Sequence, residues 1–133
     1  MTNSHDIEVY VRFCETDAIG HVNNTSHFLY FEEARTKFFR MIHPNRQSSS
    51  SFILASIKCD YIEQAYAGQV LKVSTNVLYI GTKSFTIRHR LIASDSNKII
   101  AEAEAVTVCF DFKNQKTIPL NRELRESLEE YMV

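Results

Sequence analysis

The chain has 133 residues, of which 44% are hydrophobic and 23% charged, and its formal net charge is −1 at pH 7. This size predicts a single domain over residues 1–133. Lys, Arg, Asp and Glu are mixed along the chain, which argues against a nucleic-acid-binding surface. No apolar stretch is long enough for a membrane span or a signal peptide, so we expect a cytoplasmic protein.

The three cysteines, Cys14, Cys59 and Cys109, lie in strand-like runs and form no CxxC pair and no zinc-type spacing with histidines. Buried, reduced thiols are therefore expected, and they also favour the cytoplasm. The sequence contains no GxGxxG, GxxxxGK[ST] or GxSxG motif. We expect neither a metal ion nor a cofactor.

The first predicted element is a half-buried strand, because Ile7, Val9, Val11 and Phe13 alternate with residues of the opposite face. The chain then leaves the sheet edge in a turn that contains Asp17. A helix is predicted from near Asn24, because residues 23–26 are all N-cap types. Its apolar stripe is expected to comprise Phe28, Phe31, Phe38 and Ile42, flanked by Leu29, Ala34 and Phe39.

Asp17 is therefore expected beside the free N–H groups and positive dipole end of a helix. A carboxylate there can act as a general base or as a nucleophile, and the backbone N–H of Asn24 can polarise a carbonyl group. The local pattern taken alone favours a simpler role for Asp17, as a turn or capping residue.

The rest of the chain predicts a polar loop and an antiparallel sheet. The loop covers residues 44–51, and strands are expected at 53–66, 70–80, 84–94 and 99–112, with turns at Gly68, Gly81 and residues 95–97. Ala101, Ala103 and Ala105 share a face on which the helix can approach closely. A short C-terminal helix capped by Asn121 completes an α+β fold.

Motifs along nearly the whole chain resemble the hotdog-fold acyl-CoA thioesterases of the 4-hydroxybenzoyl-CoA thioesterase family. They are Arg12-Phe13, Thr16-Asp17-Ala18, Gly20-His21-Val22-Asn23-Asn24, Phe28, Phe31-Glu32-Glu33-Ala34-Arg35, Asp60-Tyr61, Ala65, Gly68, Tyr79-Ile80-Gly81 and Ser84. The chain departs from the family at Gln64, where a proline is common, and at Gln69, where an acidic residue is common. Some branches carry a histidine at the position of Asn24.

The resemblance implies a hotdog fold, in which an antiparallel sheet wraps a long central helix, and hydrolysis of an acyl-CoA thioester to free acid and CoA. It implies that Asp17 is the catalytic carboxylate, that Asn24 contributes its backbone N–H, and that His21 orders the loop with at most a minor catalytic part. It places Ser84 near the pantetheine channel. It also implies a homodimer or homotetramer with active sites between subunits.

Coenzyme A phosphates require cations, and Lys83, Arg88 and Arg90 are candidates within or beside one strand. A solvated outer face of the sheet explains the same residues equally well. Two rival functions stay open: a hydratase or dehydratase of acyl thioesters that pairs Asp17 with His21, and a non-catalytic protein that binds acyl thioesters.

Overall fold

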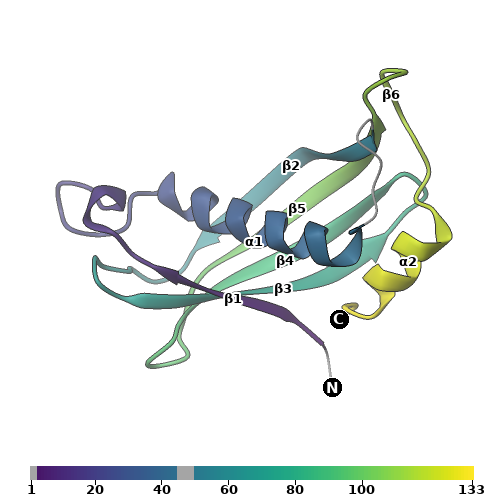
Figure 1. Ribbon diagram of the computed structural model, residues 1–133. Helices are drawn as coiled ribbons and strands as arrows, with labels where there is room; N and C mark the ends of the chain where they lie inside the picture. Colours follow the sequence, from purple (N-terminus) through teal and green to yellow (C-terminus); the bar gives the residue numbers. More distant parts are fainter. Residues whose placement is uncertain (1–2, 45–49) are drawn as a thin grey trace.

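The structure is a computed structural model that describes residues 3–44 and 50–133. One long helix, α1 (Ser26–Ile42), lies across one face of an antiparallel sheet (Figure 1). A short helix, α2 (Arg122–Glu129), follows near the C-terminus. This is the predicted α+β architecture, a central helix wrapped by a sheet.

The sheet has six strands in the order β1-β3-β4-β5-β2, and β6 pairs with β5 beside this path. The strands are β1 (His5–Tyr10), β2 (Ser50–Tyr61), β3 (Val70–Ile80), β4 (Ser84–Ala93), β5 (Ile99–Asp111) and β6 (Lys116–Thr117). β1 and β2 therefore form the two edges. Within the described ranges, no strand pairs with the outer edge of β2.

The predicted strand from 53 to 66 starts too late and ends too late. β2 pairs with β5 from Ser50 to Tyr61, so its first two residues belong to the sheet and not to the predicted loop. After Tyr61 the chain turns away, because the N–H groups of Ile62 and Glu63 both donate to the carbonyl of Ile100. Residues 45–49 of the predicted loop lie outside the described part of the chain.

The core lies between α1 and the sheet. Phe31, Ala34, Phe38 and Ile42 are buried as the helical stripe predicts, and they pack over the small side chains of β5 at Ala101, Ala103 and Ala105. The prediction was wrong for Leu29, whose side chain is 55% exposed. The buried face of α1 instead extends to the polar residues His27, Tyr30 and Arg35.

The N-terminal strand is shorter than its alternating pattern predicts. β1 ends at Tyr10, and Phe13–Glu15 form one turn of 3-10 helix, in which Phe13 is 85% exposed. Cys14 is exposed in this turn, so the prediction of a buried thiol fails there, whereas Cys59 is half-buried and Cys109 is buried. The predicted cap of α2 is confirmed, because the Asn121 side chain accepts a hydrogen bond from the N–H of Leu124.

Candidate active site

Asp17 lies in a tight turn between the 3-10 helix and α1. Its Oδ1 accepts hydrogen bonds from the N–H groups of Ile19, at 2.9 Å, and His21, at 3.3 Å. Gly20 closes the turn with a positive φ of 95°, and its N–H donates to the Asp17 carbonyl. Among the described residues, no hydrogen bond engages Oδ2 of Asp17, and the residue is exposed. One carboxylate oxygen therefore holds the turn while the other faces outward.

Main-chain hydrogen bonds connect the segment after Asp17, residues 21–23, to neighbouring parts of the chain. Val22 donates to the carbonyl of Ala65, and Asn23 donates to that of Glu15. The ring of His21 packs edge-on against Tyr66, at 5.0 Å between centroids. The Asp17–His21 contact thus runs through a backbone N–H, and the described contacts contain no bond between the two side chains.

The start of α1 leaves one donor without a partner. The helix begins at Ser26, two residues later than predicted, because the Asn23 side chain accepts hydrogen bonds from the N–H and hydroxyl of Thr25 and so holds residues 23–25 in a turn. The Ser26 N–H donates to the carbonyl of Asn23. Within the described part of the chain, the N–H of Asn24 donates no hydrogen bond. This N–H is available to a ligand.

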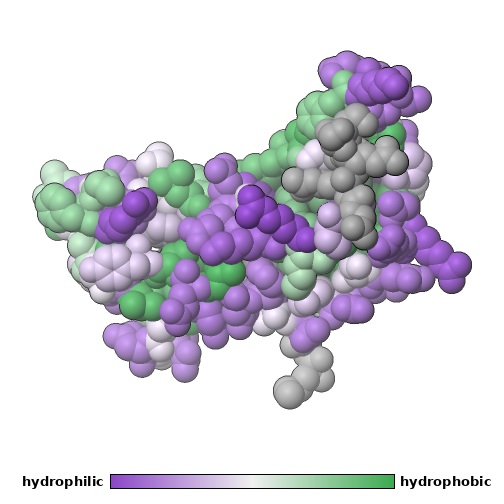
Figure 2. Space-filling view, viewed as in Figure 1, coloured by the Kyte–Doolittle hydropathy of each residue, from purple (hydrophilic) through white to green (hydrophobic). Residues whose placement is uncertain are grey.

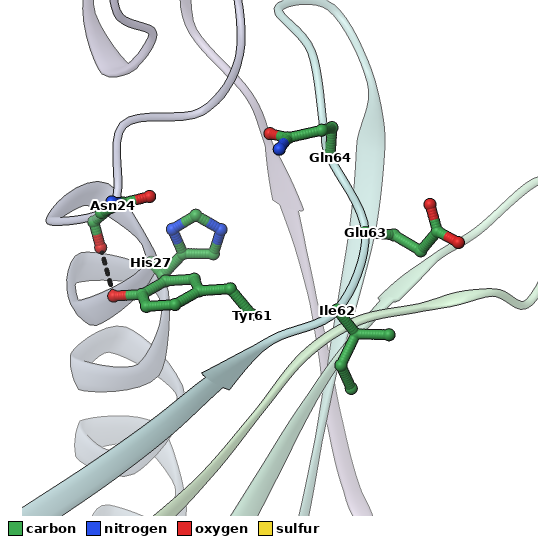
Figure 3. A pocket seen from close by; sticks show the side chains of 6 residues that line it. All are labelled: Asn24, His27, Tyr61, Ile62, Glu63 and Gln64. Carbon is green, nitrogen blue, oxygen red and sulfur yellow. Dashed lines mark hydrogen bonds between the residues drawn. The ribbon is translucent and has the colours of Figure 1, made fainter.

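A cavity of about 140 Å³ opens beside Asn24 (Figure 3). It is lined by Asn24, His27, Tyr61, Ile62, Glu63 and Gln64. The Tyr61 hydroxyl donates to the Asn24 carbonyl at 2.9 Å, which ties the end of β2 to the start of α1. Asp17 is not part of this lining.

His27 forms one wall of this cavity and is almost fully buried. Its Nδ1 lies 3.1 Å from the Asn23 carbonyl, an acceptor, so Nδ1 carries the proton. Burial lowers the pKa of His27 and keeps the ring neutral, although hydrogen bonds to the backbone of Asn23 and Asn24 oppose the shift. The ring meets Tyr61 edge-on at 4.8 Å.

The predicted coenzyme A ligands lie elsewhere in the chain. Ser84 begins β4, and Lys83 is exposed in the preceding hairpin, at the end of the sheet covered by the C-terminal half of α1. Asp17 and Asn24 lie at the opposite end of α1 (Figure 1). One chain therefore does not bring the two groups together.

Arg88 and Arg90 lie on the face of β4 that turns away from α1, because the alternate residues Ile87 and His89 are buried beneath the helix. Arg90 forms an ion pair with Glu102 at 3.0 Å. Arg88 donates to the Asn76 side chain, and burial together with the neighbouring Arg90 lowers its pKa. Both the phosphate-binding and the solvated-face interpretation are compatible with this placement.

Comparison with known proteins identifies the family. The model of the thioesterase-like superfamily matches residues 11–128, which include the turn of Asp17, α1 and β2 to β5. The chain belongs to the thioesterase-like superfamily. Its fold is the hotdog fold of that superfamily, as the sequence motifs predict.

Three relatives illustrate this membership. YsmA of Bacillus subtilis is 36% identical over 85 residues, which are 62% of this chain and 56% of YsmA. The long-chain acyl-CoA thioesterase FadM of Escherichia coli is 26% identical over 92% of this chain and 96% of FadM. A predicted thioesterase from Bacillus stearothermophilus superposes with a TM-score of 0.87, with 28% identity and 98% coverage of both chains.

Sequence reasoning did not single out two residues that line the cavity of the candidate site, His27 and Tyr61. His27 precedes Phe31 by four residues and so continues the buried stripe of α1, a signal that the sequence did contain. Tyr61 belongs to the Asp60-Tyr61 motif of the resemblance, but that motif carried no indication that Tyr61 contacts Asn24, 37 residues away.

The described residues also bear on membrane insertion and metal binding. In residues 3–44 and 50–133, neither helix has the length and hydropathy needed to cross a membrane. Over the same ranges, no three His, Cys, Asp or Glu side chains gather in a way that could hold a metal ion. Glu33 forms an ion pair with Lys37 at 2.8 Å, an i,i+4 pairing on the surface of α1.

Proposed function

We propose that this protein hydrolyses an acyl-CoA thioester, with Asp17 as general base or nucleophile and the N–H of Asn24 as the donor to the carbonyl oxygen. The observation that carries the proposal is the pairing, within one eight-residue segment, of an outward carboxylate oxygen with an unpartnered N–H at a helix start. Membership of the thioesterase-like superfamily and the activity named for FadM support the same reaction.

As a general base, Asp17 takes a proton from a water molecule whose oxygen attacks the thioester carbonyl carbon. The carbonyl oxygen becomes an oxyanion and accepts the Asn24 N–H, a contact of a kind worth about 3 kcal/mol in the transition state. The carbon–sulfur bond then breaks, and the coenzyme A thiolate leaves and takes up a proton. The products are the free acid and CoA.

As a nucleophile, Oδ2 of Asp17 attacks the same carbon and expels CoA, which leaves a mixed anhydride that water then hydrolyses. Turnover in water enriched in heavy oxygen separates base catalysis from the nucleophilic route in which water attacks the Asp17 side of the anhydride. If water attacks the Asp17 carbonyl of the anhydride, the heavy isotope is incorporated into Asp17, whereas base catalysis labels the released acid alone.

The cavity beside Asn24 is the natural place for the acyl group next to the reacting carbon. Tyr61 and His27 line it with their aromatic rings, which lie close together beside Asn24 (Figure 3), and Ile62, Glu63 and Gln64 complete the lining. An acyl group that enters here brings its carbonyl to the N–H of Asn24.

A second copy of the chain is proposed to complete the site by pairing with the free edge of β2. Leu54 and Tyr61 on this strand are 39% and 46% exposed, and Figure 2 shows hydrophobic side chains gathered over the upper ends of β2 and β5. An unpaired edge of this length is a template for another strand. A two-fold axis through the middle of β2 would give a closed homodimer.

Such a dimer would bring together the two groups that one chain separates. Ser84 of β4 pairs with Val108 of β5, and Val108 pairs in turn with Ile53 near the start of β2. Asn24 instead contacts Tyr61, at the end of β2. A two-fold axis at the middle of β2, between residues 55 and 56, places the partner's Ile53 opposite Lys58, three residues from Tyr61. The partner's Ser84 and Lys83 then lie about three strand spacings across the joined sheet and three residues along it, roughly 18 Å in all, from Tyr61. A coenzyme A arm can span that gap.

The proposal is tested by measuring free thiol released from a panel of short, branched, aromatic and long-chain acyl-CoA esters, with and without a chelator. We expect release from at least one class, at a rate that the chelator does not change. No release from any class, combined with tight acyl-CoA binding, would favour the non-catalytic alternative. Hydration of enoyl-CoA without thiol release would favour the hydratase alternative.

A further inference from the structure

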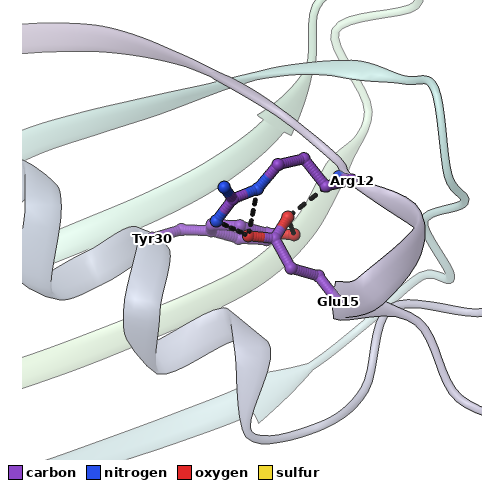
Figure 4. A network of polar contacts seen from close by, with 3 residues as sticks. All are labelled: Arg12, Glu15 and Tyr30. Carbon is purple, nitrogen blue, oxygen red and sulfur yellow. Dashed lines mark hydrogen bonds and ion pairs between the residues drawn. The ribbon is translucent and has the colours of Figure 1, made fainter.

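Glu15 is a buried carboxylate two residues before Asp17, and it is surrounded by donors (Figure 4). Its Oε1 accepts the Arg12 N–H and the Tyr30 hydroxyl, both at 2.9 Å. Its Oε2 accepts the Arg12 guanidinium at 3.0 and 3.2 Å. A buried carboxylate is tolerated when its oxygens are satisfied in this way.

The backbone of Glu15 extends the same network to the site. Its carbonyl accepts the N–H of Asn23 at 2.9 Å, and Asn23 immediately precedes the proposed oxyanion donor Asn24. Glu15 therefore contacts the end of β1 through Arg12, α1 through Tyr30, and the segment before the helix through Asn23. Asp17 and Asn24 are each within two residues of these contacts.

Within this network, the hydrogen bond between Tyr30 and Glu15 is buried from solvent, whereas the ion pair with Arg12 is open to it. The Arg12 side chain is 68% exposed, whereas the Glu15 side chain is 8% exposed and Tyr30 is 3% exposed. Burial would raise the pKa of Glu15, but the hydrogen bonds from Arg12 and Tyr30 outweigh it and lower that pKa. Burial and the contact with Glu15 raise the pKa of Tyr30. At neutral pH a charged carboxylate thus accepts from a protonated phenol.

We infer that Glu15 and Tyr30 are positioning residues that set the separation between the Asp17 carboxylate and the Asn24 N–H. This inference rests on the proposed thioesterase function. Tyr30 lies on the rigid helix, so its hydroxyl transmits the position of α1 to the turn that carries Asp17. A displacement of reacting groups by about 1 Å can cost a factor of 10² in rate, and a loosened Glu15 permits such a displacement.

The test uses Tyr30→Phe, which removes one oxygen atom, together with Glu15→Gln and the double variant. We expect Tyr30→Phe to lower kcat about tenfold and to change KM less than twofold, because the acyl and CoA contacts stay in place. Since Tyr30 acts through Glu15, the double variant should be no slower than Glu15→Gln alone. The amide of Asn23 should exchange with solvent faster in Tyr30→Phe.

Tyr131→Phe is the matched control, because its hydroxyl donates to Met41 Sδ and the residue packs on Phe38, at the other end of α1. It should leave kcat and the exchange of the Asn23 amide unchanged. Wild-type kcat in Tyr30→Phe, or additive losses in the double variant, would overturn the inference. Asp17→Asn is measured beside these variants: if it abolishes turnover while Tyr30→Phe keeps the wild-type kcat, the inference fails and the proposed function stands.

Discussion

His89 is a histidine that the fold holds without charge. It is fully buried on β4, its Nδ1 lies 2.8 Å from the Thr75 hydroxyl, and its ring stacks on Phe31 at 5.5 Å with planes 8° apart. Within the described chain, its Nε2 has no hydrogen-bond partner. Burial and, to a smaller extent, the positive charge of Arg35 lower the pKa of His89 to about 3.

This lowered pKa predicts a pH-dependent stability. In the unfolded chain His89 takes up a proton near its ordinary pKa of about 6.5, whereas the folded chain resists it, so acid favours unfolding. Between pH 7.5 and 5 the wild type should lose about 2 kcal/mol more unfolding free energy than His89→Gln. Urea unfolding at both pH values measures this difference. Equal losses of unfolding free energy in the two proteins would show that His89 takes up its proton in the folded chain over the same pH range as in the unfolded chain.

Arg88 and Arg90 remain candidates for the coenzyme A phosphates. If they bind phosphate, Arg88→Ala combined with Arg90→Ala should raise KM for acyl-CoA far more than KM for the corresponding pantetheine thioester, which lacks the nucleotide. Added salt should mimic the substitution, because exposed charges are screened. Equal changes for both substrates would assign these arginines to the solvated face, with Arg90 paired to Glu102.

At the scale of elements, α1 is the largest contributor of aromatic side chains to the core. Phe38 is fully buried and meets Tyr131 edge-on at 5.4 Å and His5 at 5.7 Å. Phe38→Ala should therefore lower the unfolding free energy by about 3–5 kcal/mol, since it leaves a cavity. Thermal or urea unfolding measures the loss.

Leu29→Ala on the same helix is the control, because Leu29 is exposed by 55%. It should change stability by less than about 0.5 kcal/mol. A large loss at Leu29 with a small one at Phe38 would mean that α1 presents a different face to the sheet.

The strands β3, β4 and β5 were predictable because their burial alternates locally, and β3 has the predicted bounds. The start of α1 and the end of β1 could not be predicted in this way, because hydrogen bonds to residues distant in the sequence determine both positions. Asn23 is held by Glu15, and Tyr30 reaches Glu15 from 15 residues away. The family motif made Asp17 the candidate carboxylate, which stays a prediction, but no local pattern could place Tyr61 against Asn24.

At the scale of the whole molecule, the proposed site needs two chains, and mixed dimers test this directly. Asp17→Asn chains lack the proposed catalytic carboxylate, whereas Ser84→Tyr chains obstruct the proposed pantetheine channel. Each variant alone should be nearly inactive. If the partner supplies Ser84, a mixed dimer contains one intact site, because its Asp17 and Ser84 come from the two unaltered positions.

A refolded one-to-one mixture of the two variants should therefore recover about a quarter of wild-type activity, because about half of its dimers are mixed and each has one intact site. Sedimentation should show a dimer or tetramer throughout. A mixture as inactive as its components would place Asp17 and Ser84 of the same chain in one site, whereas active Ser84→Tyr chains would remove Ser84 from the site. A fully active monomer would contradict the two-chain site.

The most direct test of the central claim is Asp17→Asn, with kcat and unfolding measured on the same sample. Asparagine keeps the oxygen that accepts the N–H groups of Ile19 and His21 but removes the charge and basicity of Oδ2. We predict that kcat falls at least about 10²-fold while KM and Tm change little. Near-wild-type turnover, with a stability loss of about 0.5–2 kcal/mol, would contradict the account and leave Asp17 as a residue that stabilises its turn.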